Sequence, residues 1–532
     1  MRRMRQVWKN SIEAMVAALV GLVLVSCASA DNPSQALGET TPVRAFGCTV
    51  GDFRDGTWKI AVPPGKDHAD VLFPLPPGTT EADGLALDFY AADLRSFSHF
   101  YERVLKDGKM VCRFVKSPVH QGGWERLELR KADGVSLDRN PDRTWAGAQV
   151  LKFSVDLVVP NDGAEFRIGN LRTVRGDAPT VRPKADERRL GWCPNVNDRL
   201  TDWDGLAAAM SARGFTDMIV LAARGANAYY RTELLPMAEG FASGYDAARG
   251  AIAAAHAHGL KCHLWKTSWQ VRSTAPKAFV AQLEREGRLQ VTKDGKIDRG
   301  WMCPSDERNR RLEVETMKEF VALGADGIHF DYIRYADDTH CFCPRCLKRF
   351  SEQVGREVKS AKEIRADQGL LAKWSDFRAE LISSVVKESA DCVHALGRGL
   401  EVSAATYRHA PTDYTRNGQD WPRWCREGWM DFICPMDYYY SPDVHRAYVT
   451  RQMNCLKGTK AKLYPGIGVS SSSTSRMPKE IFAEQLDTIR SLGLGGYTVY
   501  PVDDYALSLL SDSVSDCRCR DEAGGGKVQK TK

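Results

Sequence analysis

Apolar and polar residues along the chain follow two different rhythms, with a change between them near residue 180. From residue 46 to residue 176, short runs alternate apolar and polar positions, as in LELRK and EFRIGNL. This alternation is typical of antiparallel strands that bury one face and expose the other. Because such runs recur regularly and no convincing helical pattern interrupts them, residues 46–176 are predicted to form a jelly-roll-like β-sandwich.

Residues 186–510 instead alternate strand-like runs with longer helical patterns. Residues 308–324 repeat apolar positions at helical spacing, and residues 478–493 begin with Pro and end with Gly, as helices prefer. Several of the strand-like runs are apolar nearly throughout, which indicates cover on both faces. Eight such units match a (β/α)8 TIM barrel. The predicted strands are residues 188–193, 217–223, 260–266, 327–333, 400–407, 431–439, 461–467 and 495–502.

The N-terminus has the pattern of an export signal. Residues 1–27 start with the basic stretch MRRMRQVWK and continue into twelve apolar residues, which is short for a membrane span and typical of a signal peptide. The apolar run ends at Leu-Val-Ser-Cys27, which resembles the lipobox of bacterial lipoproteins; the alternative is an ordinary secretory signal cleaved after Ala30. We expect a lipidated Cys27, a tether over residues 28–45, and a polar tail over residues 511–532.

Charge gives no argument for a nucleic-acid partner. Half of the formal charge of +6 lies in the first 26 residues, and no basic stripe with interleaved aromatic residues follows. Hydrophobic residues make up 43% of the chain, which is enough for a full core. We therefore expect a folded cell-envelope protein that is anchored in a membrane by its lipid and faces the periplasm or the exterior.

Two carboxylates fall where the chemistry of a barrel is expected. The C-terminal ends of the strands form the mouth of a TIM barrel, and Asp331 and Asp437 lie near those ends of the fourth and sixth predicted strands. A pair of carboxylates cleaves glycosidic bonds when one protonates the leaving oxygen and the other attacks or activates water. We predict a retaining mechanism with Asp331 as nucleophile and Asp437 as acid/base. The alternatives are an ion pair of Asp331 with Arg334 and a helix cap at Asp437.

The other strand ends are rich in side chains that suit a polyhydroxylated ligand. Aromatic faces stack on sugar rings, and charged or amide groups bond sugar hydroxyls. Glu401 begins the fifth strand and should face the opposite end. The predicted substrate-binding residues are Arg224, Asn227, Tyr229, His263, Trp265, His329, Arg334, Tyr407, Tyr438 and Asp503.

Several blocks in residues 188–505 resemble, in their order, the glycosyl-hydrolase-like ten family of bacterial envelope lipoproteins. They are IVLAARGANAYYRTELLP, GYDAARGAIAAAHAHGLKCHLW, GWMCPSDERNRR, ADGIHFDYIRY and DWPRWCREGWMDFICPMDYYY. The resemblance implies a TIM barrel and glycoside hydrolysis, which in some members is associated with peptidoglycan glycan strands. It also implies that Asp331 is the catalytic carboxylate.

Three closely spaced cysteines follow the fourth predicted strand. Cys341, Cys343 and Cys346, with His340 beside them, have the spacing of a structural zinc site. The alternative is a disulfide, which an oxidising compartment favours, with a partner such as Cys517 or Cys519 in the tail. No other cofactor is expected.

Two functions remain open at this point. The first is a glycoside hydrolase that acts on an extracytoplasmic polysaccharide. The second is a carbohydrate-binding lipoprotein that has kept the barrel without catalysis, because a fold does not fix a function. In either case the β-sandwich is a candidate carbohydrate-binding domain. An esterase is disfavoured, since no G-x-S-x-G motif occurs.

The first testable prediction concerns the anchor. Replacing the acylated residue, Cys27→Ala, should release the protein from the membrane fraction, because an acylated cysteine would be the only tie to the bilayer. Fractionation followed by immunoblotting checks this. A wild-type protein that is already soluble and begins at Asp31 contradicts it.

Overall fold

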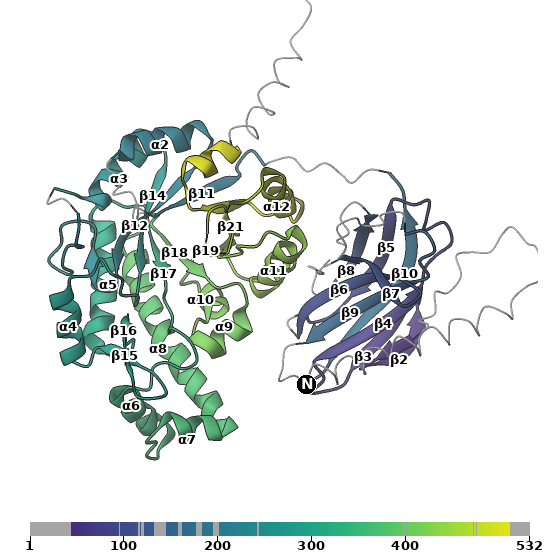
Figure 1. The fold of residues 1–532 in the computed structure, drawn as a ribbon, viewed down its shortest axis with the longest axis horizontal. Helices are drawn as coiled ribbons and strands as arrows, with labels where there is room; N and C mark the ends of the chain where they lie inside the picture. Colours follow the sequence, from purple (N-terminus) through teal and green to yellow (C-terminus); the bar gives the residue numbers. More distant parts are fainter. Residues whose placement is uncertain are drawn as a thin grey trace, which may run out of the picture. The chain divides into compact units, whose positions relative to one another are not determined.

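The computed structural model describes residues 44–510, which divide into two compact units near residue 180 (Figure 1). Short gaps in this description fall at residues 95, 115–117, 119–121, 132–144, 158–161, 177–183, 195–201, 242–243, 398, 472 and 475. The predicted signal segment with Cys27, nearly all of the tether, and the tail with Cys517 and Cys519 lie outside the described residues. Among the described helices, none combines the length and the apolar character needed to cross a membrane.

The N-terminal unit is built from two antiparallel five-stranded sheets, as the alternating pattern predicts. In order across the sheet, the first contains β1 (Arg44–Phe46), β4 (His68–Pro74), β9 (Val150–Leu157), β6 (Phe97–Lys106) and β7 (Lys109–Phe114). The second contains β2 (Thr49–Arg54), β3 (Thr57–Val62), β10 (Ala164–Val174), β5 (Gly84–Tyr90) and β8 (Trp124–Arg130).

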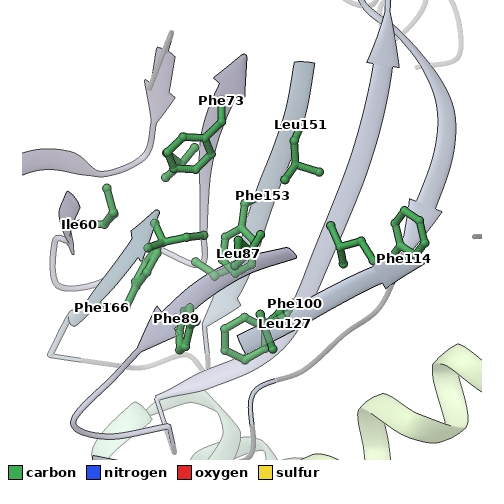
Figure 2. Close-up of a cluster of buried hydrophobic side chains, with 14 of the residues drawn as sticks. Ile60, Phe73, Leu87, Phe89, Phe100, Phe114, Leu127, Leu151, Phe153 and Phe166 are labelled. Atoms are coloured by element: carbon green, nitrogen blue, oxygen red, sulfur yellow. The ribbon is translucent and has the colours of Figure 1, made fainter. Parts of the chain in front are cut away.

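Phenylalanine rings from both sheets fill the core of this unit (Figure 2). Phe89 of β5 lies 5.5 Å from Phe166 of β10 in its own sheet, measured between ring centroids. It also lies 5.6 Å from Phe100 and 5.9 Å from Phe153, which belong to the other sheet. Rings at these separations join the two layers through apolar burial and aromatic contact. The predicted β-sandwich is therefore confirmed.

The C-terminal unit is a parallel sheet that closes on itself. Its strands are β11 (Arg188–Cys193), β12 (Asp217–Arg224), β14 (Lys261–Thr267), β17 (Gly327–Asp331), β18 (Glu401–Thr406), β19 (Phe432–Pro435), β20 (Lys462–Leu463), β21 (Gly466–Gly468) and β22 (Gly496–Tyr500). The seventh predicted strand is divided into β20, which pairs with β19, and β21, which pairs with β22. Because β22 also pairs with β11, the strands form a ring, and the predicted TIM-type barrel is confirmed.

Helices follow the strands around the barrel (Figure 1). They include α2 (Trp203–Ala212), α3 (Ala247–Ala257), α5 (Glu307–Ala322), α8 (Gln368–His394), α10 (Trp421–Arg426), α11 (Pro442–Cys455) and α12 (Lys479–Ser491). The segments between strands also contain β13 (Asn227–Ala228), α4 (Lys277–Arg285), the hairpin of β15 (Leu289–Val291) and β16 (Ile297–Met302), α6 (Pro344–Val354), α7 (Ala361–Ala366) and α9 (Ala410–Asn417). The apolar stripe of the predicted helix 308–324 is the buried face of α5.

Charged side chains also meet where the strands begin. Arg188 donates hydrogen bonds to Asp217 and, at 2.7 Å, to both oxygens of Glu401. The imidazole of His263, near the start of β14, lies 3.0 Å from the Asp217 carboxylate. These groups are buried or partly buried, so each charge needs its partners. Glu401 therefore faces the end of the barrel opposite the mouth, as its place in the strand indicated.

Candidate functional site

A cleft of about 540 Å³ opens where the barrel strands end. Its walls combine aromatic rings, arginines and small polar groups. The lining residues are Trp192, Pro194, Leu221, Arg224, Trp265, Thr267, Gln270, Arg272, Asp331, Tyr332, Arg334, Ala405, Tyr407, Arg408, Met436, Tyr438, Ser470, Ser471, Ser473 and Tyr500.

Asp331 is the last residue of β17 and lines the cleft with only 4% of its surface exposed. Its Oδ1 accepts a 2.7 Å hydrogen bond from the backbone N–H of Tyr332. This bond depends on a sharp turn, because Tyr332 has a left-handed φ of 49°, an uncommon conformation for a side chain of this size. Burial raises the pKa of Asp331, while the charges of Arg334 and Arg224 offset part of the increase.

Arg334 lies against Asp331 and is 2% exposed. Its guanidinium carbon is 4.2 Å from the ring centroids of both Tyr332 and Tyr407, so the group is held between two aromatic faces. Its Nη1 is 3.6 Å from Asp331 Oδ1, which is an ion pair but too long for a good hydrogen bond. Arg334 Nε and Nη1 have no hydrogen-bond partner among the described atoms. The Asp331–Arg334 pair that was the alternative interpretation of Asp331 thus exists, but it leaves Nε and Nη1 of the guanidinium without a hydrogen bond.

One wall of the cleft is aromatic. Tyr438 and Tyr500 stack with centroids 5.3 Å apart and an interplanar angle of 9°. Trp192 meets both edge-on, at 6.3 Å and 5.9 Å, and donates its indole N–H to Nε2 of His329 at 3.0 Å. Burial lowers the pKa of His329, so the ring is neutral and can accept that bond. Flat aromatic rings that line a cleft suit the face of a sugar.

The cleft brings together six of the residues predicted from the sequence: Arg224, Trp265, Asp331, Arg334, Tyr407 and Tyr438. The other five predicted binding residues have different positions. Tyr229 accepts a 2.7 Å hydrogen bond from Arg224 Nε and so supports a lining residue. Asn227 is fully buried in β13, and Asp503 accepts a hydrogen bond from the N–H of Ala506 at the start of the last helical turn.

The two predicted histidines do not line the cleft. His263 lies near the beginning of the third strand, β14, and therefore at the end of the barrel opposite the mouth. There it is hydrogen-bonded to Asp217. His329 lies beneath the cleft floor and acts through Trp192, as described above. Position within a strand decides both outcomes, since only the residues near a strand's C-terminal end reach the mouth.

Asp437 turns away from the cleft, contrary to the prediction that it faces Asp331. The chain turns tightly after β19, where the N–H of Asp437 donates a 2.9 Å hydrogen bond to the carbonyl of Pro435, and Met436 and Tyr438 line the cleft. Asp437 is fully buried, and its Oδ1 accepts a 2.8 Å hydrogen bond from Gln452 of α11. Its Oδ2 has no partner, and burial raises its pKa to about 8. Asp331 is therefore the sole carboxylate among the lining residues that the structure describes.

Several lining residues were not predicted. Trp192 and Tyr500 end the first and eighth strands, so the rule that selected Asp331 also selects them. Tyr332 adjoins Asp331. Gln270, Arg272, Ser470, Ser471 and Ser473 come from loops, where no periodic signal indicates which side chain turns inward.

A second cluster contains four buried thiols. Cys341, Cys343 and Cys346 meet Cys303, which precedes α5, with sulfur–sulfur distances of 3.7–3.8 Å from Cys303 to the other three. These distances exceed the roughly 2.05 Å of a disulfide. Zinc with four sulfur ligands at about 2.3 Å in a tetrahedron separates them by about 3.8 Å. The cluster therefore fits a structural zinc ion. The distances do not fit the alternative of a disulfide, and His340 is not one of the four groups.

Backbone amides complete the thiol cluster. The N–H of Val291 points at Cys341 Sγ at 3.2 Å, and the N–H of Cys346 points at Cys343 Sγ at 3.4 Å. Such donors favour thiolates, the form that binds metal. His340 lies instead 2.8 Å from Asp337 and 3.3 Å from Asp298. The fourth ligand was missed because Cys303 lies 38 residues from Cys341 and meets it only in the folded chain.

Comparison with known families agrees with this architecture. Residues 224–480 match the family model described as glycosyl hydrolase-like 10, so the C-terminal unit is a glycosyl hydrolase-like TIM barrel. This segment contains Asp331, Arg334, the four cysteines and most of the cleft. No curated protein matches the chain.

Solved structures resemble the chain at low sequence identity. A β-galactosidase from the psychrophilic Marinomonas ef1 is 10% identical, with a TM-score of 0.44, over 63% of this chain and 60% of the enzyme. The spore cortex-lytic enzyme SleL of Bacillus megaterium is 10% identical, with a TM-score of 0.37, over 66% of this chain and 76% of the enzyme. An α-galactosidase from Thermus thermophilus is 10% identical, with a TM-score of 0.34, over 88% and 92%. The chain spans half to three fifths of the β-galactosidases that it matches.

The second prediction uses the buried carboxyl of Asp437. Because its pKa is raised to about 8, the folded protein keeps a proton that the unfolded chain releases near pH 4. The free energy of unfolding of the wild type therefore falls as pH rises through this window. Asp437→Asn cannot ionise, so its stability relative to the wild type should increase by at least about 1 kcal/mol between pH 5 and pH 8.

Denaturant unfolding at several pH values measures this difference. The same variant should retain ligand binding and any turnover, because residue 437 does not line the cleft. A loss of turnover of about 100-fold or more, with unchanged stability, would instead restore Asp437 as the acid/base.

Proposed function

We propose that the protein is a glycosidase that cleaves an extracytoplasmic polysaccharide in the barrel cleft, with Asp331 as its catalytic carboxyl. The observation that carries this proposal is the placement of Asp331, buried at the end of β17 with a raised pKa and facing an aromatic wall. The export signal predicted for residues 1–27 supports a substrate outside the cytoplasm.

The raised pKa of Asp331 suits a general acid better than the nucleophile expected from the sequence. In this role Asp331 gives its proton to the glycosidic oxygen as the bond to the anomeric carbon breaks. Water then adds to that carbon and releases a proton, and Asp331 is reprotonated. The Arg334 charge, 3.6 Å away, stabilises the carboxylate that forms when the proton leaves.

A specific observation also favours the second candidate, a carbohydrate-binding protein without turnover. Glycosidases generally pair two carboxylates across the scissile bond. Among the described lining residues, Asp331 has no such partner. Binding without cleavage needs only the aromatic wall and the polar groups, which the cleft also provides.

The third prediction separates these two functions. Asp331→Asn keeps the shape of the side chain and its acceptor for Tyr332 N–H but cannot donate the catalytic proton. Turnover of a polysaccharide panel, measured as new reducing ends, should fall by about 100-fold or more, while calorimetric binding persists. The Asp437→Asn variant is the matched control, because it makes the same chemical change outside the cleft. Binding by the wild type with no cleavage of any polysaccharide supports the binding protein, and wild-type turnover by Asp331→Asn contradicts the assignment.

We also propose that Cys303, Cys341, Cys343 and Cys346 hold one zinc ion with a structural role. The ion would join three segments of the chain: the end of the β15–β16 hairpin, the loop after β17 and the start of α6. Because Arg334 lies in this same loop, the ion would also fix the backbone next to the cleft.

The fourth prediction follows from the zinc proposal. The purified protein should contain about one zinc per chain by elemental analysis, and Cys303→Ser should lose most of it. The free energy of unfolding should fall by at least about 3 kcal/mol, because metal binding contributes directly to folding. Cys193→Ser, at a buried cysteine outside the cluster, should keep the zinc. A wild-type protein without metal and with an unchanged Cys303→Ser stability contradicts the proposal.

A further inference from the structure

The cleft has an excess of positive charge. Four arginines line it, Arg224, Arg272, Arg334 and Arg408, against the single carboxylate of Asp331 among the lining residues that the structure describes. The formal balance is three positive charges in a concave site, where low-dielectric walls concentrate the field. A neutral sugar chain has no group that would compensate this excess.

Nearby carboxyls do not neutralise the arginines. Asp413 feels the charges of Arg334 and Arg408, but it is buried behind the wall and accepts a 2.7 Å hydrogen bond from the N–H of His409. Burial raises the pKa of Asp413 to about 7 and that of Asp437 to about 8. Near neutral pH both carboxyls are therefore partly or mostly protonated.

Asp331 does not account for all four arginines either. Arg334 and Arg224 lower its pKa and thus act on its charge, whereas Arg272 and Arg408 are not among the groups that act on it most strongly. Arg408 is packed 4.5 Å from the ring centroid of Tyr439, and Arg272 is exposed at the rim. Two cations in the cleft therefore lack a protein carboxylate in the lining.

Arg334 is also prepared for a ligand. Two tyrosine rings fix its guanidinium, and its buried Nε and Nη1 have no hydrogen-bond partner among the described atoms, which costs free energy. A fixed guanidinium fork matches the two oxygens of a carboxylate. Binding such a group would offset the cost, since the ordering of the side chain has already occurred.

We propose that the ligand of this cleft is an acidic glycan, a polysaccharide in which sugar units carry carboxylates. The proposal deepens the function given above and rests on it, because it names the chemical class of the sugar that the same cleft binds. The aromatic wall of Trp192, Tyr438 and Tyr500 contacts the sugar rings. The arginines select the carboxylates, which sit on the ring as in uronic acids or on an ether side chain as in muramic acid.

Binding of matched ligand pairs, with and without carboxylates, tests the role of ligand charge directly. The measurements use the Asp331→Asn protein, so that cleavage does not interfere. The first pair is a polyuronate and the same polymer with its carboxylates reduced to alcohols. The second pair is peptide-free peptidoglycan strands and chitin oligosaccharides, which share an amino-sugar backbone and differ in the lactyl carboxylates. In at least one pair the acidic member should bind about tenfold or more tightly, and the preference should shrink as salt increases from 50 to 500 mM.

Two arginine variants connect the preference to the cleft. Arg272→Gln removes an exposed rim charge without disturbing the core, and Arg334→Gln removes the buried one. Each should reduce the ratio of the binding affinity for the acidic ligand to that for the neutral ligand by a factor of about three or more. Arg311→Gln, on the exposed face of α5, should not change this ratio. Circular dichroism controls for folding of the Arg334→Gln protein, and Arg272→Gln provides the result if that variant fails to fold.

The outcomes distinguish this inference from the proposed function. Equal binding of the acidic and neutral members of both pairs overturns the acidic-glycan inference and leaves the glycosidase proposal standing. A preference that survives both variants also overturns it, because the selectivity would then lie outside the cleft. Failure to bind any of the four glycans overturns it as well, and the reducing-end assay on the wild type then decides separately whether the protein is a glycosidase.

Discussion

The closed parallel sheet is the constraint on which the rest of the barrel depends. All of its strands run in the same direction, from β11 to β22, so their C-terminal ends meet at one rim. Side chains near those ends can enter the mouth, and Trp192, Asp331 and Tyr500 reach the cleft in this way. The same closure collects Arg188, Asp217 and Glu401 at the other rim, where Arg188 forms ion pairs with both carboxylates.

Much of the fold was predictable because it depends on periodic patterns. Alternating residues in 46–176 predicted two-faced strands, and nearly continuous apolar runs predicted strands covered on both sides; the two packed sheets and the barrel confirm both. Asp331 was predictable for the same reason, because a carboxylate at the C-terminal end of an apolar barrel strand lies at the mouth of the barrel. The failure at Asp437 has a physical cause: β19 ends at Pro435, and in the tight turn that follows Met436 and Tyr438 line the cleft while Asp437 bonds Gln452 of α11.

What the sequence did not predict depends on contacts between distant segments. Cys303 completes the thiol cluster from 38 residues before Cys341, and no local spacing identifies it. Arg272 enters the cleft from a loop, where side-chain direction follows no period. His329 has the polar side chain of a binding residue, but the fold gives it the task of holding Trp192. Sequence patterns therefore located the site, and packing decided which of its neighbours take part.

The chemistry of the site comes from combining burial with unbalanced charge. Burial raises the pKa of Asp331, and Arg334 keeps its deprotonated form accessible, so the carboxyl can both give and regain a proton. Two nitrogens of the same arginine, Nε and Nη1, have no hydrogen-bond partner among the described atoms. Proton donation and recognition of a charged glycan would thus share one pair of side chains, fixed by the turn at Tyr332 and by the ring of Tyr407.

The most direct test of this account is a crystal structure of the Asp331→Asn protein with a bound acidic oligosaccharide. The account predicts sugar rings against Tyr438 and Tyr500, a glycosidic oxygen within about 3 Å of the side chain at residue 331, and a sugar carboxylate on Arg334 or Arg408. An oligosaccharide bound elsewhere on the molecule, with none in the cleft, would contradict the claim that this cleft is the site of function.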